Sequence, residues 1–296
     1  ALIQHFWVGS VFLINVPIVV VALVLTVALA PENLPNRDKQ WDVVSSFYAL
    51  VALSGLTMAI KQAAHSPATT LAALAATAVG AWLFVRRQHR LTDPLLTFDI
   101  FRSRLFTGGV LAAAGGMFVL AGAELMTTQK LQLVDALTPL TAGATVAVMA
   151  LSAIPASTLG GAYLHKIGFL PLIAGGFFGA VVGAVALATG WTSIGMVLLG
   201  LSAGSVMSVS SIAIIGSAPM HRSGMAAGVE EVSYELGTLI TVALTGSLLQ
   251  AALDRGVEYT DAYNGVIGVL AAGAACFAVA TWWCFRDNPK SGGVDA

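Results

Sequence analysis

Three glutamates in one long apolar run are the residues whose type and position point most directly to chemistry. Glu230, Glu231 and Glu235 lie within residues 226–249, among mainly apolar, small and hydroxyl-bearing side chains. On a helix that rises 1.5 Å per residue, Glu231 lies roughly 7–8 Å and Glu235 roughly 13–14 Å from the start of this run. A charged side chain at the centre of a bilayer costs roughly 2.5–3.5 kcal/mol even on lenient scales, so a carboxyl group there indicates a function.

The spacing of these acids suits a proton exchanger. Glu231 and Glu235 are four residues apart and share a helix face, whereas Glu230 is rotated away. No Lys or Arg stands in the middle of any apolar run. Burial and mutual repulsion therefore favour a carboxyl group that keeps a proton and releases it to an arriving cation. Tyr234, next to Glu235, can donate a hydrogen bond or offer its ring to that cation. The structural alternative is that the glutamates stay protonated and hydrogen-bond to a neighbouring helix.

Glu124 is a further acid, near the end of a different apolar run. It precedes Lys130 by six residues, which is roughly 9 Å along a helix. Two interpretations stay open. Glu124 either guards an outward-facing substrate path or lies in a water-filled vestibule at the membrane surface.

The other reactive side chains give no support for an enzyme, a metal site or an ATP-driven motor. Every histidine falls at the end of an apolar run or in a loop: His5, His65, His89, His165 and His221. Cys276 and Cys284 are eight residues apart on one predicted helix, too far to form a disulfide. The sequence contains neither a nucleophile elbow nor a phosphate-binding loop. We therefore expect no catalytic residue, no cofactor and no metal.

The elements that must position these acids are long apolar runs. Charged residues make up 10% of the chain and hydrophobic residues 57%, and the mean hydropathy is +0.85. Soluble domains carry about 25% charged residues, and a helix needs about 20 residues to cross the hydrocarbon core of a bilayer. The net charge of −1 offers no basic surface for nucleic acid, so the expected surroundings are a lipid bilayer. We predict an all-α integral membrane protein with nine transmembrane helices, at residues 8–30, 43–60, 68–85, 105–125, 141–164, 169–189, 194–215, 226–249 and 263–285.

The positive charges predict how these helices are oriented, because cytoplasmic loops carry an excess of Lys and Arg. With the loop after residue 30 placed in the cytoplasm, three of the fourteen fall outside: Lys61, Lys130 and Arg255. The other eleven fall inside: Arg37, Lys39, Arg86, Arg87, Arg90, Arg102, Arg104, Lys166, Arg222, Arg286 and Lys290. We therefore expect a multi-pass protein of the cell (cytoplasmic) membrane with a cytoplasmic C-terminus.

Composition also predicts how the chain is organised. Residues 1–30 are expected to form the last helix of an N-terminal bundle. Residues 31–104 are expected to form a cytoplasmic loop, two connecting helices and an amphipathic loop, with a short interfacial helix at 95–101. Residues 105–296 are expected to form a C-terminal six-helix bundle. Glycines spaced four apart predict tight helix pairs within it, at Gly175, Gly179, Gly183, Gly200 and Gly204.

Several motifs are shared with one transporter family. They are HFWVGSVFLINVP at 5–17, DPLL at 93–96, FR at 101–102, AELMTTQKLQ at 123–132 and LTPLTAG at 137–143. The most specific is AP at 218–219 followed by AAGVEEVSYELG at 226–237. With these motifs the chain resembles the fourteen-helix drug:proton antiporter branch of the major facilitator superfamily. The resemblance is closest to the methyl viologen and quaternary ammonium exporters, and it covers nearly the whole chain.

The resemblance implies roles for particular residues. In that family the Glu-x-x-x-acid-Leu-Gly pattern lies in the thirteenth helix, where its acids are implicated in binding substrate and protons. The match carries to Glu231 and Glu235, and Glu124 matches an acid in the ninth helix of the viologen exporters. The chain departs from the family at 161–168, where His165 replaces the Asp of a cytoplasmic motif. The resemblance also implies that the family's first five helices are missing from this chain and are its partners.

The predicted function is proton-coupled efflux of lipophilic cationic drugs such as quaternary ammonium compounds, dyes or viologens, carried out within a longer chain. Glu235 and Glu231 would exchange a proton for the cation, with Glu124, Tyr234 and Glu230 contributing to the substrate and proton site. Two alternatives stay open: an exporter of a neutral metabolite or antibiotic on the same scaffold, and a non-transporting membrane subunit. An enzyme has the least support, because no nucleophile–base pair is apparent.

Overall fold

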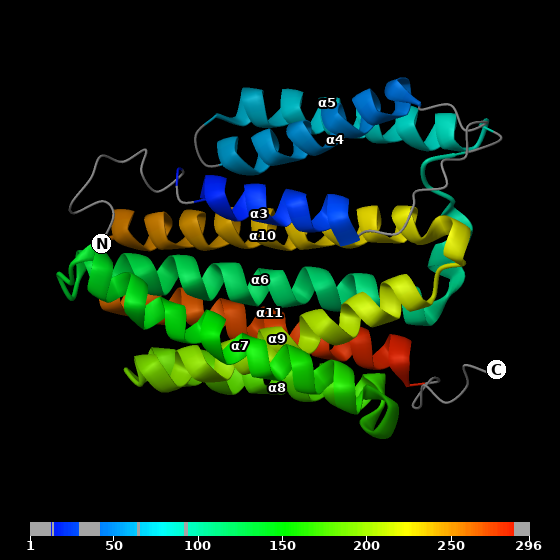
Figure 1. Ribbon diagram of the computed structural model, residues 1–296. Coiled ribbons are helices and arrows are strands. Elements are labelled where there is room, and N and C mark those ends of the chain that lie inside the picture. The colour runs from blue at the N-terminus through cyan, green and yellow to red at the C-terminus, as the bar shows by residue number, and fades with distance from the viewer. Residues whose placement is uncertain (1–12, 14, 30–41, 64–65, 92–93, 287–296) are drawn as a thin grey trace. The chain divides into compact units, whose positions relative to one another are not determined.

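The computed structural model describes residues 13, 15–29, 42–63, 66–91 and 94–286, and every regular element in these ranges is a helix (Figure 1). The chain divides into two units, Ala1–Asp42 and Val43–Ala296. The division at residues 30 and 104 inferred from composition stays a prediction. Residues 31–41 of the predicted cytoplasmic loop and motif residue 93 lie outside the described residues, as does nearly all of the motif at 5–17.

In the first unit, the described helix is α3, Asn15–Leu29. None of its residues is buried, and its sequence consists almost entirely of Val, Leu, Ile and Ala. The predicted span at 8–30 begins outside the described residues, and α3 covers the part of it that the structure describes.

The second unit contains eight helices long and apolar enough to cross a membrane. They coincide with the other eight predicted spans and confirm the all-α, multi-pass membrane fold. Their bounds are α4 Val43–Gln62, α5 Pro67–Gln88, α6 Arg104–Leu133, α7 Pro139–Ile167, α8 Phe169–Ala188, α9 Thr192–Gly216, α10 Ser223–Asp254 and α11 Tyr259–Phe285. Two short 3₁₀ helices, η1 (Phe98–Arg102) and η2 (Met220–Arg222), precede α6 and α10. The predicted interfacial helix at 95–101 therefore appears as the shorter η1, with Ile100 buried.

Local sequence signals account for where these helices begin and end. Ser103 caps α6 by accepting a hydrogen bond from the backbone N–H of Phe106 at 3.3 Å. Thr138 caps α7 in the same way, with Pro139 at the first helical position, where a missing N–H costs nothing. Gly168, at φ 91°, makes the sharp turn between α7 and α8 in a conformation that suits glycine.

Helices α6 to α11 form one packed bundle around α6 and α9. α6 packs against α9, α10 and α11, and α9 also packs against α7 and α8. Stacked and tilted phenyl rings fill the space between α6, α8 and α11, with Phe277 lying 5.8 Å from Phe118 and 6.1 Å from Phe177 between ring centroids. α4 and α5 pair with each other, and α4 also touches α10.

Glycines let several of these helices approach closely, as the four-residue spacing predicts. A Cβ at Gly200 or Gly204 would collide with backbone atoms of α7, at Met149 and Ala153 respectively. In α8, a Cβ at Gly183 would lie 3.0 Å from Leu199 of α9, whereas one at Gly175 meets nothing within 4 Å. The prediction is thus confirmed for α7–α9 and for one end of α8, but it was wrong for Gly175.

The up-and-down course of the bundle sorts its charges by end. Because neighbours such as α6 and α11 run antiparallel, one end collects Arg104, Lys166, Arg222 and Arg286. The opposite end carries Lys130 and Arg255. These described charges are grouped at the two ends as expected, and which end faces the cytoplasm stays a prediction.

Candidate functional site

The candidate site lies on α10, and its depth is set by the packing of α10 against α6. Gly237 faces Ala114 and Phe118 of α6, and Thr241 faces Gly122. The two helices therefore run parallel, and a Cβ at Gly237 would collide with the carbonyl oxygen of Ala114. Glu235, two residues before Gly237, lies near the middle of the 32-residue helix.

The structure joins two of the predicted site residues directly. Tyr234 donates a hydrogen bond from its hydroxyl group to Oε1 of Glu230 at 2.8 Å, one helical turn away. Glu230 is 8% exposed, and the Tyr234 ring is half-buried. That ring packs against a cluster formed by Ile100, Phe106, Ala113, Ile214 and Ala226. The hydrogen bond that Tyr234 was expected to donate goes to Glu230, because residues four apart share a helix face and adjacent residues do not. The role of its ring toward a cation stays a prediction.

Glu231 and Glu235 occupy a different face of α10. Both side chains are exposed, and neither makes a hydrogen bond or ion pair with any residue that the structure describes. Their shared face agrees with the four-residue spacing, and the separation of Glu230 from that face is also as predicted. The α10 acids are thus divided into one buried carboxyl group held by a hydrogen bond and two exposed ones that have no partner within the described part of the chain.

Glu124 is also exposed, but it lies at another level. Since Thr241 faces Gly122, Glu124 is level with residue 243 of α10. That position is eight residues beyond Glu235, or roughly 12 Å along the helix axis. The structure therefore does not bring Glu124 into one cluster with the α10 acids.

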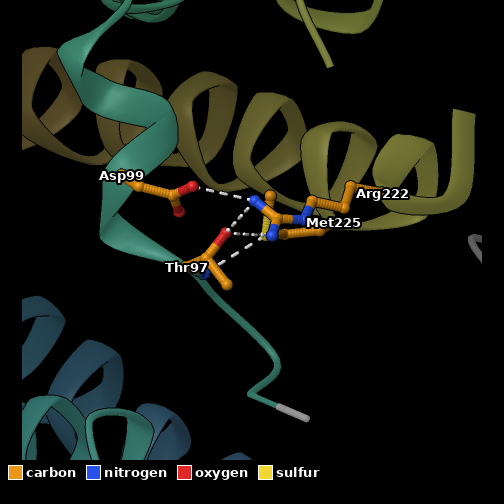
Figure 2. A network of polar contacts seen from close by, with 4 residues as sticks. All are labelled: Thr97, Asp99, Arg222 and Met225. Atoms are coloured by element: carbon orange, nitrogen blue, oxygen red, sulfur yellow. Dashed lines mark hydrogen bonds and ion pairs between the residues drawn. The ribbon is translucent and has the colours of Figure 1, made fainter. Parts of the chain in front are cut away.

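A polar network that the sequence did not reveal joins the start of α10 to the segment before α6 (Figure 2). Arg222 donates from Nη1 to Oδ2 of Asp99 at 2.9 Å and to the Thr97 hydroxyl oxygen at 3.2 Å. The backbone N–H and the hydroxyl group of Thr97 also lie 3.3 and 3.5 Å from the Met225 sulfur. The Thr97 hydroxyl group and the Arg222 guanidinium group lower the pKa of Asp99 below its ordinary 3.8. Arg222 entered the sequence analysis only as a positive charge, and its partner is 123 residues away.

A second polar cluster lies near the opposite end of α6. The hydroxyl groups of Thr127 and Tyr263 are 3.1 Å apart and buried. The Lys130 ammonium group lies 4.7 Å from the centroid of the Tyr263 ring. This cation–π contact and hydrogen bond tie the ends of α6 and α11 together. Among the described residues, no group of three or more His, Cys, Asp or Glu is placed to hold a metal.

Comparison with known proteins places this arrangement among exporters. The chain is 34% identical to the multidrug efflux pump LfrA of Mycolicibacterium smegmatis, over 98% of this chain and 61% of the relative. It is 30% identical to the methyl viologen resistance protein SmvA of Salmonella typhimurium, over 87% of this chain and 54% of the relative. The chain is thus similar to multidrug efflux pumps of the drug:proton antiporter branch of the major facilitator superfamily, the family that its motifs indicate.

A further relative is also named for resistance and export. The tetracenomycin C resistance and export protein of Streptomyces glaucescens is 27% identical, over 84% of this chain and 48% of the relative. No family model matches the chain. The chain spans about half to three-fifths of the length of these relatives. Their names describe transporters and resistance proteins, which confirms the prediction that the chain is not an enzyme.

Proposed function

We propose that this chain is part of a proton-coupled exporter of lipophilic cations. The observation that carries the proposal is that Glu231 and Glu235 share an exposed face near the middle of a membrane-spanning helix. Neither has a hydrogen-bond or ion-pair partner among the described residues. The names of the relatives support drug export, and that of SmvA points to methyl viologen, a cationic substrate.

In the proposed cycle the Glu231/Glu235 pair holds a proton while no substrate is bound. Two carboxylates one turn apart on a membrane-spanning helix repel each other, and a shared proton relieves that repulsion. A cation that arrives from the cytoplasm supplies the missing positive charge, so the carboxyl group releases its proton to water on the cytoplasmic side. When the cation leaves on the outer side, the pair takes up a proton from that side. Protons thus move inward as substrate moves outward.

Glu230 and Tyr234 have a different part in this proposal. The hydrogen bond from Tyr234 keeps the Glu230 carboxyl group on the buried face, away from the exchanging pair. Glu230 is then a secondary proton-binding residue, and Tyr234 can also present its ring to the substrate. Glu124, roughly 12 Å farther along the bundle, would meet the cation later on its way out.

The orientation of the proposed exporter in the membrane is inferred from the positions of its Lys and Arg residues. Four described Arg and Lys residues gather at one end of the six-helix bundle, and Lys and Arg are enriched on the cytoplasmic side of membrane proteins. We place the protein in the cell membrane with its C-terminus in the cytoplasm. Alternating access moves one helix bundle against another, so we expect the exporter to work together with the family's first five helices.

The relative named for tetracenomycin C supports a second candidate function, the export of an antibiotic on the same scaffold. Inside-out vesicles that contain the complete gene product distinguish the two. Under an imposed proton gradient, methyl viologen or ethidium should cause proton release if cations are exchanged for protons. No response to either cation, together with a response to tetracenomycin C, would contradict the cation proposal and favour antibiotic export.

A further inference from the structure

The end of the α4–α5 pair carries a basic pocket that the proposed transport cycle does not use. It has a volume of about 420 Å³ and lies where α5 ends beside the first turns of α4. Its walls are formed by Tyr48, Leu83, Arg86, Arg87, Arg90 and Leu91. Three of the six lining residues are arginines, and none of the described lining residues is acidic.

The geometry of α5 directs these positive charges at one place. Arg86 lies in the last turn of α5 and Arg90 in the turn that follows the helix, and both line the pocket. The Arg86 guanidinium group lies 5.0 Å from the centroid of the Trp82 ring, a contact that keeps the side chain along the helix. Arg87 also engages another group of the chain, so the inference rests on Arg86 and Arg90.

Buried hydrogen bonds hold this end of the helix pair in shape. Gln88, 3% exposed, donates from Nε2 to the Ser45 hydroxyl oxygen of α4 at 2.7 Å. Its Oε1 accepts a hydrogen bond from the backbone N–H of Leu96 at 3.0 Å. Gln88 thereby links α4, α5 and the segment that follows, so the position of the pocket relative to both helices is set.

A second hollow lies on the same face of the two helices. It has a volume of about 590 Å³, and its lining is almost wholly apolar: Val51, Ser54, Gly55, Met58, Thr69, Ala72, Ala73 and Ala76. On α5, residues 83, 76 and 69 recur every seven positions, which keeps them on one side of the helix. On α4, residues 48, 51, 55 and 58 follow the same helical periodicity. The basic pocket therefore continues into an apolar groove along the pair.

The distance between the two hollows matches one leaflet of a bilayer. Arg86 and Ala76 are ten residues apart, or roughly 15 Å along the helix. Half of a hydrocarbon core about 30 Å thick is also about 15 Å. A molecule with an anionic head at Arg86 and Arg90 and a hydrocarbon tail along α4 and α5 would fill the basic pocket and reach the near end of the groove at Ala76.

We propose that this face of the α4–α5 pair binds an anionic phospholipid. Guanidinium groups form paired hydrogen bonds to phosphate oxygens, and basic pockets between membrane helices suit lipid headgroups on the cytoplasmic side. Arg86 and Arg90 hold the headgroup phosphate, Leu83 and Tyr48 contact the glycerol region, and an acyl chain reaches the groove at Ala76 and Val51. The site is separate from Glu231 and Glu235 and does not depend on the proposed transport cycle.

Native mass spectrometry of the purified chain in a mild detergent tests this proposal. The probes are phosphatidylglycerol and phosphatidylcholine with identical acyl chains. The chain should bind phosphatidylglycerol more tightly, and Arg86→Gln with Arg90→Gln should weaken that binding by about tenfold or more while leaving phosphatidylcholine unchanged. The matched control is Lys61→Gln with Lys166→Gln, which removes two positive charges elsewhere and should keep the preference.

Three outcomes would overturn the proposal: equal binding of both lipids, equal loss in the control, or displacement of phosphatidylglycerol by millimolar inorganic phosphate. The last would identify a site for free phosphate instead. A salt titration of the unaltered chain gives a test that does not depend on whether the variants fold. Binding of phosphatidylglycerol should weaken steeply as salt screens the arginines, and a flat response would contradict the site.

Discussion

The Tyr234 hydroxyl group donates a hydrogen bond to Oε1 of Glu230 at 2.8 Å, across one turn of α10. This bond holds a buried carboxyl group on the face that packs against the cluster around Phe106 and Ile214. Glu231 and Glu235 are left exposed on another face. The two faces therefore separate the hydrogen-bonded, buried Glu230 from the pair to which we assign proton exchange in our proposal.

Tyr234→Phe should destabilise the protein while it leaves the packing of the ring intact. The change removes the donor and leaves a buried carboxyl group without its partner, which costs about 1–3 kcal/mol. The thermal midpoint in detergent should fall by several degrees. Tyr259→Phe is the control, because the Tyr259 hydroxyl group makes only a long contact of 3.5 Å with Gln129. Equal midpoints for the two variants would show that the Glu230 bond contributes nothing.

Asp99 and Arg222 should support the fold in a pH-dependent way. The pKa of Asp99 is lowered in the folded protein, so its contribution is fully present at pH values above the unfolded pKa of about 3.8. The contribution is lost as pH falls through the lower folded pKa. The difference in thermal midpoint between wild type and Asp99→Asn should be constant from pH 7 to about pH 5 and should shrink at more acidic pH.

Arg222→Gln is the matched partner variant for this ion pair. Combined with Asp99→Asn, it should cost less than the sum of the two single changes, because the pair is broken only once. Both groups are substantially exposed, so the coupling should also weaken as salt is added. Fully additive effects at low salt would mean that the pair seen in Figure 2 does not contribute to stability.

Gly237→Ala should separate α10 from α6. The new Cβ would collide with the backbone of Ala114, so one helix must move, and overpacking of this kind costs about 1–3 kcal/mol. Gly246→Ala in the same helix is the control, because a Cβ there meets nothing within 4 Å. Helix propensity should make that variant neutral or slightly more stable, by up to about 1 kcal/mol. Unfolding midpoints measured by circular dichroism compare them, and equal destabilisation would contradict the packing argument.

Glu124 and Glu235 should act independently of each other in transport. They lie at levels roughly 12 Å apart, and effects at sites more than about 7–10 Å apart are usually additive. The losses in log(kcat/KM) caused by Glu124→Gln and Glu235→Gln should therefore add in the double variant. Glu231→Gln and Glu235→Gln share one face and should be less than additive. The opposite pattern would place Glu124 within the exchanging unit.

Much of the fold could be predicted because the length and hydropathy of an apolar run are enough to identify a membrane helix. The close approach at Gly200 and Gly204 was also predictable, since only the periodicity of one helix is needed to see it. The four-residue spacing likewise indicated the shared face of Glu231 and Glu235. What needed the structure was the partner of each side chain.

Pairing between distant segments has no local signal. Asp99 and Arg222 are 123 residues apart and meet only because α10 begins beside η1. Gly175 carries the same four-residue spacing as Gly183, yet it faces no neighbour, because α8 meets α9 at this level through the adjacent Gly176, which faces Val206. The sequence placed Tyr234 beside Glu235 but did not identify the acceptor of its hydrogen bond, which is Glu230, one helical turn away.

The most direct test of the central proposal is proton release from inside-out vesicles that contain the complete gene product with and without Glu235→Gln. Methyl viologen or ethidium is added under an imposed proton gradient, and Glu258→Gln serves as the control because Glu258 precedes α11 at a helix end. Cation-dependent proton release should be present in wild type and in Glu258→Gln and absent in Glu235→Gln. Equal release from all three proteins would contradict a role for Glu235 in coupling the proton to the cation.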